Sequence, residues 1–135
     1  MRRRIAERGA AAVEFAILLP VVLLIIGGIV DFGRFFFAKI ELTNAAREGA
    51  RAAVVTTGTP TPGPTDRVLA ALPGVPAPSI AIAPICSTAG STATVTVSVS
   101  ASFDWMVLKP AMNIVGAGAA LPATVGGKAA MRCGG

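Results

Sequence analysis

Few side chains in this 135-residue sequence can do chemistry. The chain has no histidine, which removes the commonest general base and the commonest transition-metal ligand. Its two cysteines, Cys86 and Cys133, cannot complete a four-ligand zinc site without histidine. Beyond residue 57 the only side-chain carboxylates are Asp66 and Asp104, so no ordinary acid–base pair can be drawn there. The sequence therefore predicts a protein that is not an enzyme and has no catalytic residue, metal or cofactor.

Charge and composition also bear on nucleic-acid binding and on catalysis by a serine–lysine pair. Hydrophobic residues make up 53% of the chain and charged residues 14%, with a formal net charge of +5. Residues 57–135 contribute only four basic and two acidic residues to it, too few to favour DNA uptake or another nucleic-acid partner. Serines and threonines are plentiful in residues 57–135. An enzyme in which a serine acts with Lys109 or Lys128 as its base remains an alternative. No small-molecule substrate is expected.

The longest apolar run lies near the N-terminus. Residues 15–30 carry no charge, and extension back to Ala10 gives 21 residues with one charge, Glu14. About 20 residues suffice to cross a bilayer. Four arginines precede the run, Arg2, Arg3, Arg4 and Arg8. They predict a single-pass helix in the cell membrane at about 10–30, with a cytoplasmic N-terminus and the remainder outside.

Two alternatives to a spanning helix are weaker. A cleaved secretory signal needs a small-x-small site just after Val30, where the sequence DFGRFFFAK offers a poor one. A buried core helix needs a partner that covers all its sides. The residues beyond 56 are proline-rich and too few for that.

The helix is expected to continue past the membrane as one element over residues 10–57, because residues 31–55 contain no proline. Its outer part carries small residues at helical spacing, which allow close approach of another element: Ala45, Ala46, Gly49, Ala50 and Ala53. Residues 58–65 read as a proline-rich linker.

The remaining residues, 66–135, read as an extracytoplasmic β-rich domain. Alternation over 93–103 puts Val95, Val97 and Val99 on one face, and weaker strand patterns cover 80–86 and 123–133. The apolar segment 105–121 is expected to form a loop or short helix that covers a sheet edge. We expect an α+β fold, in which the long helix covers the apolar face of a small antiparallel sheet.

Alternation also predicts the state of the cysteines. Cys86 shares the parity of Ile80 and Ile82, and Cys133 shares that of Val125 and Met131. Both thiols then point to the covered face, and outside the cytoplasm they are expected to form a disulfide. Two buried free thiols are the alternative.

The first nine residues, MRRRIAERG, resemble a class III signal of the type IV prepilin kind. The resemblance implies that a prepilin peptidase cuts after Gly9, so that the mature chain begins at Ala10 and keeps its apolar helix. Glu14 is then the fifth residue of the mature chain. A neighbouring subunit's new α-amine at Ala10 can neutralise this carboxylate at the edge of the hydrocarbon, whereas an unpaired Glu14 among headgroups is the simpler alternative.

Longer motifs extend the resemblance. RGAAAVEFAILLP, DFGR and LTNAAREGAR, with a closing KAAMRC, are similar to the TadE-like family of the tight adherence (Flp, type IVc) pilus. This implies a pilin-like fold and a minor pseudopilin role in a pilus or secretion apparatus. The implied partners are other pilin-like subunits and pilus assembly platform proteins. A membrane-anchored binding module that is not processed is the competing function.

Overall fold

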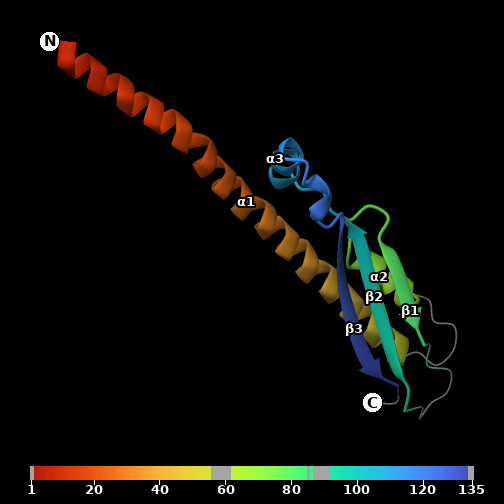
Figure 1. Cartoon of the computed structure of the whole chain (residues 1–135). Helices are drawn as coiled ribbons and strands as arrows, with labels where there is room; N and C mark the ends of the chain where they lie inside the picture. Colours follow the sequence, from red (N-terminus) through yellow and green to blue (C-terminus); the bar gives the residue numbers. More distant parts are fainter. Residues whose placement is uncertain (1, 56–61, 85, 87–91, 134–135) are drawn as a thin grey trace. The chain divides into compact units, whose positions relative to one another are not determined.

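The computed structural model describes residues 2–55, 62–84, 86 and 92–133, with side chains from residue 10 onward (Figure 1). The chain forms two compact units. One combines residues 1–34 with residues 104–121, and the other combines residues 35–103 with residues 122–135. A single helix, α1 (Arg2–Val55), contributes its first part to one unit and its second part to the other.

Helix α1 differs from the expected helix at its start. It begins at Arg2 rather than at Ala10, because the basic leader contains no proline and a single glycine does not end a helix. Pro20 lies inside α1. The expected helix end at Thr57 and the first four linker residues, 58–61, lie outside the described residues.

The next element is the short helix α2 (Pro64–Ala70). Proline suits the first turn of a helix because it lacks an N–H that would go unpaired there. The backbone N–H of Gly63 donates to the Asp66 carboxylate at 2.8 Å and so ties down the start of the helix. The helix therefore takes in the last two residues of the expected linker.

Three antiparallel strands follow in the order β1-β2-β3, with β2 in the centre. They are β1 (Ser79–Ala83), β2 (Thr94–Ser102) and β3 (Thr124–Arg132). Val97 of β2 pairs with Ile82 on one side and with Ala129 on the other. The valines of β2 are buried and its serines and threonines are not. This is the expected α+β layout, a long helix packed on a small antiparallel sheet.

The core of this unit lies between the sheet and the second part of α1. Six helix residues at spacings of three and four are buried there, and all but one are small: Leu42, Ala45, Ala46, Gly49, Ala50 and Ala53. A Cβ added at Gly127 of β3 would collide with the α1 backbone at Leu42 and Thr43. Glycine is therefore required at this position, and it lets helix and strand touch backbone to backbone.

Cys86 and Cys133 form a disulfide with a Cα–Cα distance of 5.8 Å. Both residues are nearly fully buried. The bridge spans 47 residues and ties the segment after β1 to the end of β3. It therefore restrains all three strands of a domain whose helix contributes mostly small side chains.

The segment between β2 and β3 differs from its expected position. It forms α3 (Leu108–Ile114) and a short 3-10 helix, η1 (Gly118–Ala120). We expected it to cover a sheet edge, but residues 104–121 form a unit with the first part of α1. The physical reason is a polar contact with Asp31, described below.

Candidate functional site

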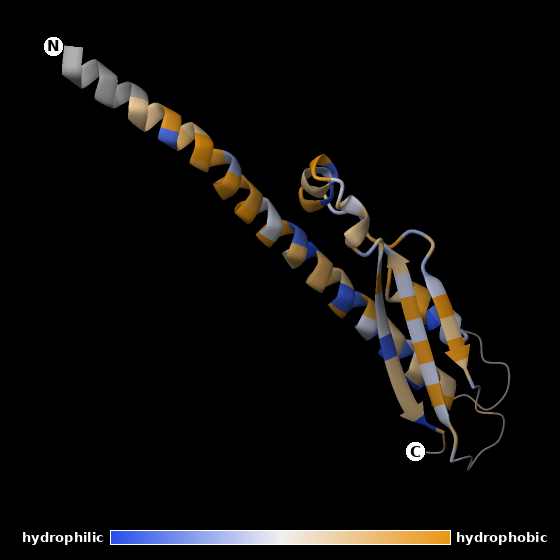
Figure 2. Cartoon of the chain, viewed as in Figure 1, coloured by the Kyte–Doolittle hydropathy of each residue, from blue (hydrophilic) through white to orange (hydrophobic). Residues whose placement is uncertain are grey.

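Residues 10–26 of α1 carry apolar side chains with one charge, Glu14, and Figure 2 colours most of this stretch as hydrophobic. Every side chain from residue 10 to residue 26 is exposed. The helix is long and apolar enough to cross a membrane, and only 6% of its most apolar window is buried in the protein. A core helix would be mostly covered, so this surface fits a single-pass membrane anchor.

The predicted processing and assembly residues all lie on this helix. Gly9 and Ala10 are within α1, about two turns from its start. Glu14 is exposed among apolar neighbours, and Val13 and Phe15 are 60% and 66% exposed. Among the side chains that the structure describes, Glu14 has no ion-pair partner. Its position leaves the carboxylate accessible to a group from another chain.

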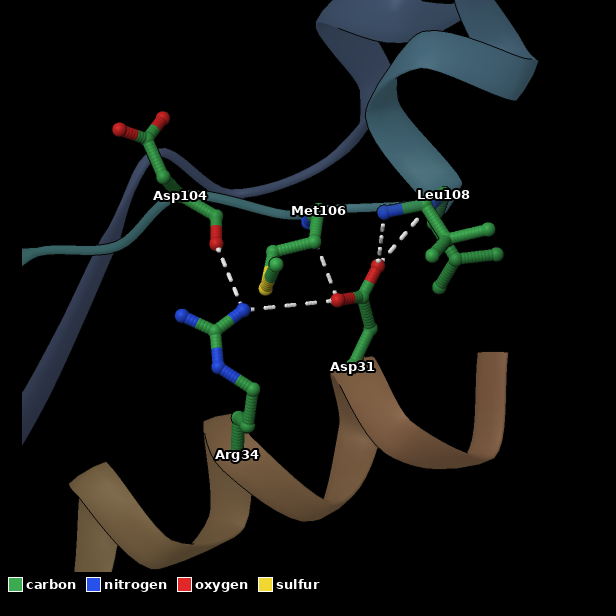
Figure 3. A network of polar contacts seen from close by, with 6 residues as sticks. Asp31, Arg34, Asp104, Met106 and Leu108 are labelled. Atoms are coloured by element: carbon green, nitrogen blue, oxygen red, sulfur yellow. Dashed lines mark hydrogen bonds and ion pairs between the residues drawn. The ribbon is translucent and has the colours of Figure 1, made fainter. Parts of the chain in front are cut away.

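A polar cluster follows directly after the apolar run (Figure 3). Asp31 is fully buried, and its carboxylate accepts three backbone hydrogen bonds from the start of α3. The N–H of Met106 donates to Oδ1 at 3.0 Å, and those of Val107 and Leu108 donate to Oδ2 at 2.9 Å each. A helix leaves its first N–H groups without partners, so Asp31 supplies what the sequence of α3 lacks.

Arg34 completes the cluster one turn further along α1. Its guanidinium lies 3.6 Å from Asp31 Oδ1 and donates to the carbonyl oxygen of Asp104 at 3.3 Å. Lys109 forms a longer ion pair of 3.8 Å with the exposed Asp104 side chain. The only fully buried charge in the described part of the chain is thus both hydrogen-bonded and paired.

These contacts set the protonation state of Asp31. Burial by itself raises the pKa of the carboxyl, because it disfavours the charged form. The three N–H donors and the Arg34 guanidinium outweigh burial and lower the pKa below its ordinary value of 3.8. Asp31 is therefore ionised at neutral pH and holds α3 as a charged acceptor.

The sequence analysis missed the role of Asp31, although the residue stands within the DFGR motif. The signal was a carboxylate directly after an uncharged run, with an arginine three residues later. Two adjacent glycines, Gly27 and Gly28, precede it by one turn and are buried. A Cβ at Gly27 would collide with Val107, so the glycine allows the segment to approach α1 closely.

Two phenylalanines that follow the apolar run pack against buried aromatic rings. Phe32 packs edge-on against buried Trp105 at 5.5 Å between ring centroids, and Phe35 does the same with buried Phe103 at 5.3 Å. Phe36 and Phe37 remain exposed.

The residues predicted for helix packing lie under the sheet, remote in sequence from Glu14. Ala45, Ala46, Gly49, Ala50 and Ala53 are all buried within their own unit. A cavity of about 310 Å³ lies at the far end of α1, lined by Glu48, Arg51, Ala52, Val55, Pro62 and Arg67. No group of three or more potential metal ligands occurs among the described residues.

Comparison with known families adds one finding. Residues 9–51 match the model of the TadE-like protein family. The match covers α1 from the predicted processing site to the small buried residues and includes Glu14 and Asp31, which confirms the resemblance seen in the motifs. No curated protein and no solved structure matched the chain. The TadE-like family implies a structural component associated with the tight adherence pilus rather than an enzyme.

Proposed function

We propose that the protein is a minor pseudopilin-like structural or assembly component of a tight adherence pilus or a related secretion apparatus. The observation that carries the proposal is the exposed apolar surface of α1, with a single carboxylate at Glu14, in a region matched by the TadE-like family. Such a surface suits lipid and the helices of other subunits equally well.

Processing is the first step of the proposed function. A prepilin peptidase cuts between Gly9 and Ala10 on the cytoplasmic side, where the four arginines retain the N-terminus. Cleavage removes these charges and creates an α-ammonium at Ala10. The sheet-bearing unit then lies outside the cytoplasm, where its disulfide is stable.

Assembly follows from the new amine. The α-ammonium of one subunit pairs with Glu14 of its neighbour, which neutralises both charges at the edge of the hydrocarbon. The exposure of Glu14 supports this pairing. Its partners are other pilin-like subunits and the platform proteins that assemble them.

Intact-mass measurement tests the proposal in cells that carry the native peptidase. We expect a mature chain that begins at Ala10, and Gly9→Val should leave the full-length chain in the membrane. Glu14→Gln should still be processed but should run as a smaller complex in mild detergent. Glu48→Gln is the matched control, because Glu48 is an exposed glutamate further along α1.

Two results would contradict parts of the proposal. A native mass that starts at Met1 or Arg2 would exclude the processed signal and favour a simple membrane-anchored binding module. A Glu14→Gln complex of unchanged size would exclude the pairing while leaving the processing intact.

A further inference from the structure

Residues 104–115 carry apolar side chains that nothing in their own unit covers. Ile114 is 87% exposed, Val115 76% and Met106 66%. The segment 104–121 contains only two charged residues, Asp104 and Lys109. Exposed apolar side chains gathered in one short segment mark a surface that a membrane or another protein covers.

The contacts of the segment show where it runs. Asp104 contacts Arg34, Trp105 contacts Phe32, and Leu108 reaches Asp31 and Gly28. From residue 104 to residue 108 the segment therefore runs along α1 in the direction of the N-terminus of α1. Figure 1 shows α3 beside α1 in this arrangement.

The descent brings the segment to the level of the membrane anchor. If residues 10–30 span the hydrocarbon, then Asp31 lies at its outer boundary and Gly27 about 6 Å inside it, at 1.5 Å of rise per residue. Val107 packs at Gly27 and Leu108 at Gly28. The start of α3 therefore lies at the level of the last turn of the apolar run, and Ile114 and Val115, at its other end, are exposed as the side chains of residues 10–26 are.

The polar contacts of α3 also suit lipid. Water would satisfy the first N–H groups of a helix at no cost, but in a bilayer each unpaired group costs several kcal/mol. Here Asp31 accepts the N–H groups of residues 106, 107 and 108. At the other end, the N–H groups of residues 115, 116 and 117 donate to the carbonyls of Met112 and Asn113. Three N–H groups at the start of α3 and two carbonyls at its end are therefore paired within the protein.

We propose that residues 106–115 form a second membrane contact, in which α3 dips into the outer interface of the bilayer beside α1. Ile114, Val115 and Met106 enter the acyl-chain region, and Lys109 extends its ammonium back toward the headgroups. The protein then holds the membrane by a spanning helix and a shallow apolar element locked to it through Asp31. This inference rests on the membrane anchor but on neither processing nor assembly.

Fluorescence quenching by brominated phospholipids tests the inference in the full chain. Trp105 is the only tryptophan, so Trp105→Phe provides a silent background. Ile114→Trp then reports α3, Val22→Trp reports the spanning helix, and Leu69→Trp on α2 is the matched control. All three replaced side chains are exposed, so a tryptophan fits each position.

We expect bromine in the acyl chains to remove emission at position 114 as it does at position 22, and to leave position 69 unchanged. Bromine near the headgroups should quench position 114 more than bromine near the bilayer centre.

Loss of emission at position 22 but not at 114 would overturn the inference and leave the anchor intact. A blue-shifted emission at 114 without quenching would mean that another protein chain covers α3, which also overturns it. Absence of quenching at position 22 would overturn both the anchor and the inference.

Discussion

Residues 13–26 and 42–53 of α1 belong to one continuous helix, yet their side chains differ in size and in exposure. The first stretch carries large apolar side chains, and all of them are exposed. The second carries alanine and glycine at the spacing of one helix face, and these are buried under the sheet. The comparison teaches that hydrophobicity alone does not identify a core. Large exposed side chains suit lipid, whereas small ones let a sheet approach the helix.

The largest expected effect concerns the disulfide. Cys86→Ser should destabilise the sheet-bearing unit by about 4 kcal/mol, because the loop of 47 residues regains its freedom in the unfolded chain. Hydrogen exchange of the full chain in detergent measures this, with faster exchange over β2 and unchanged exchange over residues 13–26. Cys133→Ser should have the same effect as Cys86→Ser. Equally faster amide exchange in residues 13–26 and in residues 42–53 would contradict the difference in packing between these two stretches of α1.

A matched pair of leucines tests the comparison directly. Leu42 is 1% exposed and Leu24 is 46% exposed on the same helix. Leu42→Ala should cost about 3 kcal/mol, because it leaves a cavity under the sheet. Leu24→Ala should change the stability of the sheet-bearing unit by less than about 0.5 kcal/mol.

Thermal unfolding, followed by the circular dichroism of the strands, gives both values. Similar losses in the two variants would mean that residues 13–26 also carry folded-state packing.

The smallest expected effect is local and concerns the junction between the two stretches. Asp31→Asn removes the charged acceptor, so the attachment of α3 should weaken by about 1–2 kcal/mol. Faster exchange at the amides of residues 106–108, with β2 unchanged, is the expected signature.

Acid should have the same effect as this substitution. Because the folded-state pKa of Asp31 lies below the ordinary value of 3.8, its contribution is complete above that value and is lost as the pH falls through the lowered pKa. If hydrogen exchange at the amides of residues 106–108 were as slow in Asp31→Asn as in the unsubstituted protein, then contacts other than Asp31 would hold α3 in place.

Local patterns in the sequence determined the anchor, the strands and the helix face. An uncharged run after four arginines predicts a membrane helix whatever the rest of the fold, because the hydrophobicity and charge of each residue do not depend on tertiary contacts. The period of two over 93–103 likewise predicted β2 to within one residue at each end. The TadE-like motifs could be read in the same way, since they occupy short contiguous stretches.

Only the tertiary structure decided the place of residues 104–121 and the role of Asp31. Their contacts join positions 75 to 77 residues apart. The donors are backbone N–H groups, which every residue except proline carries, so no side-chain pattern marks them. Apolar residues such as Ile114 also fit a sheet edge as well as they fit a bilayer, judged by sequence alone. The buried carboxylate selects between these positions, because it requires three donors and finds them only where α3 meets α1.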